Sequence, residues 1–287
     1  MLTHSDAVDA GAVGRGIGSS TDDGSCLTAE SDWASHAVLG MRLDATSCQD
    51  GARSIIDWAA AGESRVVCAA SVNNVMHARS DPRYLTVMNG ADLVTPDGMP
   101  LVWALRGLGV RRAEHVRGTD LTTAVLQCAA DEGVAVGFFG GSPDVLQELL
   151  ASVGRRWPRL RIAYAYSPPF REASRAEDER TVESINASGA QILFVGLGCP
   201  KQELWMASHR DRVHEVMLGV GAAFDFLAGR KRQAPRLMQR TGTEWLFRLA
   251  AEPRRLWKRY LRQNPRFLAL IALQLIAARI GRRPSET

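Results

Sequence analysis

The stretch VAVGFFGGSP, residues 134–143, joins an apolar run to a turn of small residues. The segment after it, 144–156, carries a helical pattern, and Pro143 suits the first turn of a helix. The same order of strand, turn and helix recurs on both sides, for example over residues 65–80 and 192–209. Strands that alternate with helices predict a mostly parallel sheet with helices on both faces. The expected fold class is therefore α/β, with a Rossmann-like sheet.

The apolar patterns give the expected elements their ranges. Strands are expected over residues 37–43, 65–70, 134–139, 161–166, 192–197 and 215–220, and another apolar run covers 85–88. Helices are expected over residues 50–61, 71–80, 99–108, 144–156, 173–187 and 203–209, with a further helix that starts at Gly118.

Three regions are expected along the 287 residues. Residues 1–35 are rich in Gly, Ser, Asp and Thr without a periodic apolar pattern, which predicts a disordered leader. Residues 36–229 form the expected Rossmann-like catalytic domain. Residues 230–287 form an expected basic, amphipathic helical appendage, with helices over 235–251, 253–262 and 265–280 that are punctuated by prolines.

Charge is unevenly distributed in this mildly basic chain, which has a formal charge of +4 and a pI near 9.0. Residues 230–283 are rich in arginine and contain only Glu244 and Glu252 as acids, so the two parts are expected to meet different partners. The five cysteines are scattered without metal-ligand spacing, which indicates reduced thiols in a cytosolic protein and no zinc site. No signal peptide and no membrane-spanning run are recognisable.

Four loops carry most of the candidate chemistry, because ligands of open parallel sheets bind beyond the carboxyl ends of the strands. They cover residues 71–74, 89–98, 140–142 and 198–202. The densest is NGADLVTPDG, residues 89–98, which is expected to connect the run 85–88 to the helix 99–108. Helix N-termini with small residues would make these loops a binding site for a diphosphate, because free backbone N–H groups and the helix dipole favour anions.

Each candidate side chain in these loops also has a structural interpretation. On spacing alone, Asp97 is favoured as the N-cap of the helix that follows it. For Asp92, a structural role as a turn cap is at least as good an interpretation as a role in the site. Ser71 and Asn73 fit a turn into the next helix as well as they fit a binding site. The pair Gly140-Gly141 lacks the spacing of a dinucleotide fingerprint or a P-loop.

Arg117 and Gln202 are open to the same alternatives. A lone arginine before a helix is usually solvated, and a glutamine in the first turn of a helix usually makes a local cap. We assign no chemistry to the six histidines, which are dispersed.

Taken together and in order, several motifs closely resemble the WecG/TagA/CpsF family, which is glycosyltransferase family 26. The motifs are SVN at 71–73, NGADLVTPDG at 89–98, HVRGTD at 115–120, FFGG at 138–141 and VGLGCPKQE at 195–203. The resemblance covers residues 38–226, and the basic tail resembles the family's carboxyl-terminal appendage more loosely. Family members are bacterial enzymes that pass a sugar from a UDP-sugar to a lipid-linked saccharide.

The resemblance implies roles for individual residues. Asp97 matches the family's aspartate and is the candidate base in an inverting transfer. Ser71 stands where the family usually has threonine and is a further candidate catalytic residue, and Arg117 is the catalytic candidate for charge stabilisation. The resemblance also implies a set of substrate-binding residues: Asn73, Asn89, Gly140, Gly141 and Gln202.

The resemblance further implies a reaction without metal or other cofactor, and the sequence has no Asp-x-Asp pair for a divalent ion. Positive charge would then come from arginine, and our hypothesis is that Arg230, Arg232 or Arg236 closes over the diphosphate. The later helices are expected to lie on the inner face of the cell membrane, which would make the protein cytoplasmic and peripheral. Packing of residues 267–280 on the core or in a homo-oligomer is a nearly equal alternative.

The leading functional hypothesis is transfer of N-acetylmannosamine, its uronic acid or glucose from a UDP-sugar to a polyprenyl-diphosphate-linked saccharide. The product would enter a surface polysaccharide or wall polymer. A nucleotide-dependent oxidoreductase is a second class, which the missing glycine fingerprint disfavours. A third class is a non-enzymatic module that binds membrane or nucleic acid through the tail. It leaves the loops unexplained, and the tail's tryptophans suit lipid better than nucleic acid, so we expect no nucleic-acid partner.

Overall fold

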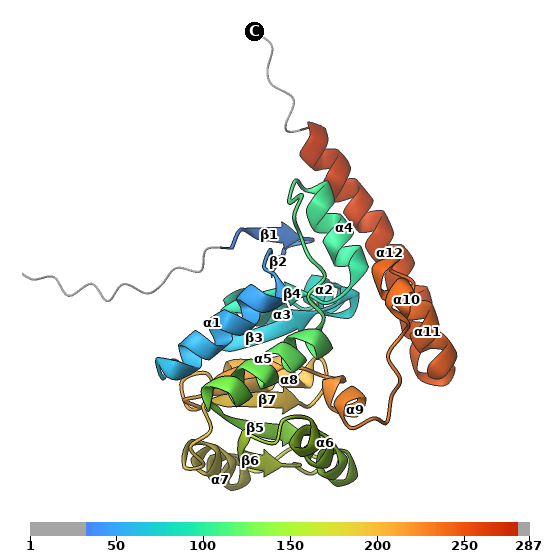
Figure 1. Ribbon diagram of the computed structural model, residues 1–287. Helices are drawn as coiled ribbons and strands as arrows, with labels where there is room; N and C mark the ends of the chain where they lie inside the picture. Colours follow the sequence, from blue (N-terminus) through green and yellow to red (C-terminus); the bar gives the residue numbers. More distant parts are fainter. Residues whose placement is uncertain (1–32, 281–287) are drawn as a thin grey trace, which may run out of the picture. The chain divides into compact units, whose positions relative to one another are not determined.

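The structure, a computed structural model, describes residues 33–280. Its centre is a six-stranded sheet in the order β4-β3-β8-β7-β5-β6, in which every pairing is parallel (Figure 1). The predicted Rossmann-like α/β class is therefore confirmed. The expected leader falls almost entirely on residues 1–32, which lie outside the described residues. The strands are β3 (Val66–Ala70), β4 (Leu93–Pro96), β5 (Ala135–Gly140), β6 (Arg161–Tyr166), β7 (Ile192–Gly196) and β8 (Val216–Gly219).

Helices cover both faces of this sheet, as the near-continuous apolar strands require. Neighbouring residues of β3 point to opposite faces, since Val66 belongs to one apolar core and Val67 to the other. The Val67 core is closed by α1 (Cys48–Ala60), α5 (Gly118–Glu132), α6 (Pro143–Arg156) and α9 (Ala223–Leu227). The Val66 core is closed by α2 (Val72–Ser80), α3 (Pro82–Gly90), α4 (Met99–Gly107), α7 (Arg175–Asn186) and α8 (Lys201–His209).

The prediction of a single strand over residues 37–43 is wrong, because the chain reverses direction within this range and forms two strands. Strands β1 (Ser35–Val38) and β2 (Met41–Asp44) pair antiparallel. Leu39 and Gly40 form the turn with φ angles of 52° and 90°. Positive φ at both central residues is what a tight hairpin turn needs, and Leu-Gly is a weak sequence signal for it.

The stretch 89–98 is not a single connection either. Helix α3 includes the apolar run 85–88 and ends at Gly90, and β4 then occupies residues 93–96. Only Asp97 and Gly98 remain between β4 and α4. The short strand escapes prediction because its four residues include Pro96, although a proline at the end of an edge strand breaks no ladder.

The carboxyl-terminal region differs from the three expected helices. Helices α10 (Arg236–Arg240) and α11 (Glu244–Ala251) replace the first, and the last two merge into α12 (Pro253–Ile280) with Pro265 inside. An interior proline costs a helix about 3 kcal/mol. Here Leu256 and Phe267 are buried on either side of it, and this packing keeps the helix continuous.

Helix α12 lies beside α4 and packs on the Val66 core through Phe267 and Ile271 (Figure 1). Its Gln274 side chain accepts a hydrogen bond from Leu39 N at 2.9 Å and donates one to Ala37 O at 2.8 Å. The structure therefore shows the alternative in which residues 267–280 contact the core.

Candidate active site

Asp97 lies directly beyond the carboxyl end of β4. Its backbone N–H donates to Ala70 O at 2.7 Å, which continues the ladder to β3 by one residue. The N-cap residue of α4 is Gly98, so the interpretation of Asp97 as the cap of that helix is wrong. The Asp97 carboxylate instead lies near the backbone N–H of Gly118, in the first turn of α5.

The surroundings of Asp97 act on its pKa in opposite directions. Loss of hydration is the largest influence and raises the pKa above its usual range. The positive charges of Arg248 and Arg117 and the Gly118 N–H lower it, and together they offset part of this rise. A carboxylate with a raised pKa that faces a cavity suits general base catalysis.

Ser71 and Asn73 lie at the carboxyl end of the neighbouring strand, β3. The Ser71 hydroxyl donates to Asn74 Oδ1 at 2.8 Å, and its backbone N–H donates to the same oxygen at 3.0 Å, so Ser71 also starts α2. The Asn73 amide donates to Cys199 Sγ at 3.1 Å. The interpretation of Ser71 as the start of the helix is therefore confirmed, and its role in the site stays a prediction.

Gln202 connects two loops through one side chain. Its Oε1 accepts hydrogen bonds from Gly198 N at 3.2 Å and from Gly221 N at 3.0 Å. Its Nε2 donates to Glu203 Oε1 at 3.0 Å, which also accepts from Asn74 Nδ2 at 3.1 Å. The loops after β7, β8 and β3 are thereby held together around the buried Glu203.

Arg117 is almost fully buried, which contradicts the interpretation of a solvated side chain. Its Nε lies 3.5 Å from Glu244 Oε2 of α11, and its NH1 lies 3.5 Å from Asp120 Oδ2. The first of these ion pairs joins the α/β sheet region to the carboxyl-terminal helices.

Two adjacent cavities contain these groups. The Arg117 pocket has a volume of about 420 Å³, and its lining includes Ser71, Asn73, Asp97, Arg117 and Gln202. The structure therefore brings these five predicted residues together. The Tyr260 pocket, of about 120 Å³, shares with it Ser71, Asn73, Asp97, Glu244, Arg248 and Arg259.

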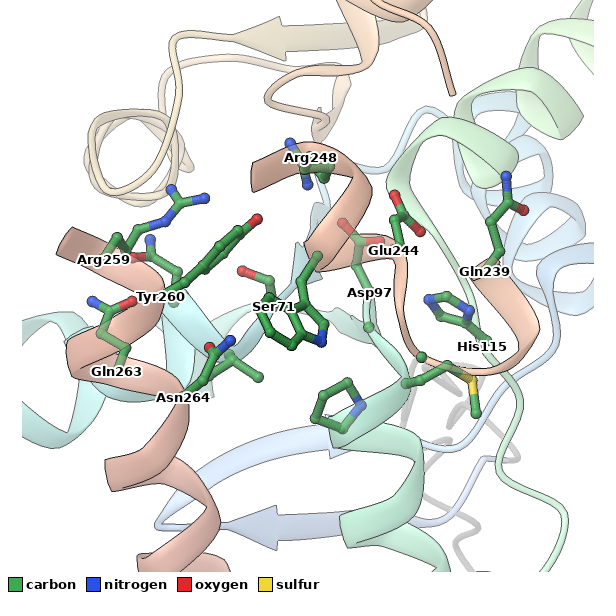
Figure 2. A pocket seen from close by; sticks show the side chains of 17 residues that line it. Ser71, Asp97, His115, Gln239, Glu244, Arg248, Arg259, Tyr260, Gln263 and Asn264 are labelled. Carbon is green, nitrogen blue, oxygen red and sulfur yellow. The ribbon is translucent and has the colours of Figure 1, made fainter. Parts of the chain in front are cut away.

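The carboxyl-terminal helices supply the opposite wall of the Tyr260 pocket. Figure 2 shows Glu244 and Arg248 on one helix, and Arg259 and Tyr260 on another, around Asp97. Within the described part of the chain, Arg259 Nε is a buried nitrogen without a hydrogen-bond partner. The cavities thus place one carboxylate base candidate opposite donor groups that could meet an anionic leaving group.

Three predicted binding residues lie outside these two linings. Asn89 is exposed and holds the hairpin, because its Oδ1 accepts from Arg42 N at 2.8 Å and its Nδ2 donates to Gly40 O at 3.1 Å. Gly140 lies at the end of β5, where a Cβ would meet the Gly196 backbone at 2.6 Å. Gly141 N–H donates to Gly196 O at 3.1 Å. Close strand contact explains Gly140, and a φ angle of 70° explains Gly141, without a ligand.

The three arginines that were expected to close over the diphosphate also lie apart from one another. Arg230 pairs with Glu148 of α6, with Nε 2.6 Å from Oε2. Arg232 is exposed and belongs to neither pocket lining. Arg236 lines a separate cavity of about 720 Å³ that also contains Arg117, so it alone of the three shares a cavity with a predicted catalytic residue.

The sequence interpretation missed the arginines that do reach the pockets, Arg248, Arg255 and Arg259, as well as Glu203. Arg255 and Arg259 are four residues apart and therefore share a helix face, which was a usable signal. Glu203 stood in a quoted motif, but nothing local indicated its burial. Asp92, the other carboxylate of the stretch 89–98, lies away from the pockets, because its carboxylate accepts a hydrogen bond from Val66 N at 2.7 Å at the opposite end of the strands.

Glu203 offers a first testable prediction. Burial raises the pKa of its carboxyl above the ordinary value of 4.5. A buried acid of this kind contributes less stability as pH rises from its unfolded pKa through its folded pKa. We expect Glu203→Gln to retain the hydrogen-bond acceptor for Asn74 and Gln202 and to reduce the loss of stability with rising pH. The variant Glu203→Ala should lower the free energy of unfolding by about 1–3 kcal/mol.

Urea denaturation of wild type and both variants at pH 5 and pH 8 measures this. The Gln variant should gain stability relative to wild type at pH 8. An identical pH dependence of wild type and Glu203→Gln would contradict the raised pKa of Glu203.

Comparison with known proteins agrees with this geometry. Residues 36–281 match the protein family described as the glycosyl transferase WecG/TagA/CpsF family. The chain belongs to this family. A curated relative, the N-acetylglucosaminyldiphosphoundecaprenol N-acetyl-beta-D-mannosaminyltransferase of Bacillus spizizenii, is 33% identical over 186 residues, which make up 64% of this chain and 70% of the relative.

Membership in the WecG/TagA/CpsF family confirms the resemblance and makes the protein a glycosyltransferase. It decides among the three functional classes in favour of sugar transfer. Among residues 33–280, no cluster of three or more His, Cys, Asp or Glu could hold a metal ion. A metal-free reaction stays a prediction.

Proposed function

We propose that this glycosyltransferase inverts the anomeric centre of a UDP-sugar as it transfers the sugar to a polyprenyl-diphosphate-linked saccharide. The observation that carries the proposal is the position of Asp97 in two joined cavities that are also lined by Arg117, Arg248 and Arg259. A carboxylate base that shares a cavity with several guanidinium groups is the arrangement that such a displacement needs.

In the proposed reaction the Asp97 carboxylate takes the proton of an acceptor hydroxyl. The hydroxyl oxygen attacks the anomeric carbon from the face opposite the diphosphate. The bond from that carbon to the β-phosphate oxygen breaks, and UDP leaves with the electron pair. Arg117 and Arg248 stabilise the charge that develops on the diphosphate, since guanidinium groups match phosphate geometry.

Ser71, Asn73 and Gln202 are proposed to position the substrates. The Gln202 amide fixes the loops after β7 and β8 through its contacts with Gly198 and Gly221. Among Arg230, Arg232 and Arg236, Arg236 is best placed to help bind the diphosphate, because it shares a cavity with Arg117.

The relative's printed name supports the choice of substrates. That protein transfers an N-acetyl-beta-D-mannosaminyl group to an N-acetylglucosaminyl diphosphoundecaprenol. We therefore place N-acetylmannosamine first among the three candidate donor sugars, before its uronic acid and glucose. The product would serve a surface polysaccharide or wall polymer.

We further propose that the protein works at the inner face of the cell membrane, where a polyprenyl-linked acceptor would be anchored. Within residues 33–280, no helix is long and apolar enough to cross a bilayer. Contact would be peripheral, through the arginines and exposed apolar residues of α12, such as Leu273 and Ile276. A homo-oligomer through the same face is the alternative.

The proposal is tested by UDP release from a panel of the three UDP-sugars, with and without an N-acetylglucosaminyl diphosphate lipid. We expect release only when one donor and the acceptor are both present, and a product of inverted anomeric configuration by NMR. Release that does not depend on the acceptor, or a product of retained configuration, would refute the mechanism.

A further inference from the structure

An apolar groove of about 530 Å³ lies next to the Tyr260 pocket. Its walls come from α4, from the turn between α10 and α11, and from helices α11 and α12. Its main apolar side chains are Trp103, Trp245, Leu249, Trp257, Leu261 and Leu268.

These side chains are unusually accessible for their size. Leu261 is 70% exposed, Leu268 is 55% exposed, and Trp103 and Trp257 are each nearly half exposed. Burial of such groups is favourable, so a contiguous exposed set of them indicates a binding surface. At Gly242 a Cβ would lie 2.5 Å from the Trp103 ring, so the close fit of this turn against the indole shapes the groove.

The groove opens into the pocket that contains Asp97. A strip of residues lines both the groove and the Tyr260 pocket: Val72, Pro100, Gly242, Trp245, Tyr260 and Asn264. A single ligand can therefore extend from Asp97 into the groove without leaving the protein surface.

Helix α12 presents a different chemistry to each cavity. Arg259 and Gln263 point to the Tyr260 pocket, whereas Trp257, Leu261 and Leu268 line the groove at helical spacing. A ligand that lies along this helix would meet cationic and polar groups first and an apolar surface next. The matching molecule has an anionic head and a hydrocarbon tail.

We propose that the groove binds the isoprene units nearest to the diphosphate of the polyprenyl acceptor. The inference rests on the proposed function for the identity of the ligand, but the groove's preference for an isoprenoid chain can be measured without turnover. The acceptor is thereby recognised through its lipid as well as its sugar, and the free part of the chain continues to the bilayer.

The test uses the full-length protein and two water-soluble acceptors, the farnesyl and the ethyl ester of N-acetylglucosaminyl diphosphate, below their micelle concentrations and without vesicles. The wild type should show a KM for the farnesyl acceptor about tenfold or more below that for the ethyl acceptor. The variant Leu261→Ser/Leu268→Ser should lose this difference and keep its kcat and its donor KM. Leu273→Ser is the matched control, because Leu273 is 64% exposed on the same helix but lies outside the groove lining.

Binding of farnesyl diphosphate, followed by the fluorescence of the groove tryptophans, gives a readout that needs no transfer. If no acceptor is converted but the double variant still weakens farnesyl diphosphate binding, the proposed function fails and the groove assignment stands. Equal KM values for both acceptors in the wild type, together with farnesyl diphosphate binding unchanged in the double variant, would overturn the assignment. So would a double variant that alters only sedimentation with anionic vesicles, or only the oligomeric state, since the groove would then contact a bilayer or a second copy.

Discussion

The variant Asp97→Asn is expected to lower kcat by about a hundredfold or more, because general base catalysis contributes an effect of this size. The amide cannot accept the proton of the acceptor hydroxyl, yet it has nearly the same shape as the carboxylate. UDP binding, measured by calorimetry, should remain within a few-fold of wild type, since the arginines that line the pockets are unchanged.

The same variant should be at least as stable as the wild type at pH 8. Loss of hydration raises the pKa of Asp97, so the ionised carboxylate destabilises the folded state as pH rises above the unfolded pKa. Asparagine has no charge to desolvate. A higher melting temperature with lost transfer would show that Asp97 is kept for chemistry, and retained transfer would leave it only the role of ligand to the α5 N-terminus.

The variant Arg248→Ala is expected to lower kcat/KM by about a hundredfold and to change its pH profile. Of the charges around Asp97, Arg248 lowers its pKa the most. Without this guanidinium the Asp97 pKa rises further, so the base becomes ionised only at higher pH. The acidic limb of the kcat/KM profile should therefore move to higher pH.

The variant Arg248→Lys is the control, because it keeps a positive charge but loses the planar guanidinium. It should return the acidic limb towards the wild-type position and recover only part of the rate. A limb that stays in place in Arg248→Ala would show that another group is the base. His115, which lines the Tyr260 pocket and whose pKa is lowered by burial, would then be examined next.

The alternation of strands and helices was enough to predict the sheet, because buried parallel strands such as β5 and β7 are continuous apolar runs. Strand β4 and the hairpin were missed because four residues carry little periodic signal. Helix α12 was divided at Pro265 by a local rule. The packing of Phe267 and Leu256, which overrides that rule, involves residues far apart in sequence.

The residues of the candidate site likewise fall into those that the sequence could predict and those that it could not. Ser71, Asn73, Asp97, Arg117 and Gln202 could be predicted because they stand in ordered motifs that resemble those of the family, and the structure brings them into one pocket. Arg248 and Arg259 could not, since the fold of the tail decides which arginine reaches Asp97. The sequence offered Arg230, Arg232 and Arg236 instead, of which Arg230 pairs with Glu148 of α6.

The two hydrogen bonds of Gln274 fix the distal half of α12 to the hairpin of β1 and β2. Gln274 and Arg259 are 15 residues apart on one helix, which corresponds to about 22 Å. The hairpin of β1 and β2 thus helps to fix the position of Arg259 relative to Asp97, although it contributes no residue to either pocket lining. The appendage and the first described strands are thereby linked by direct contacts.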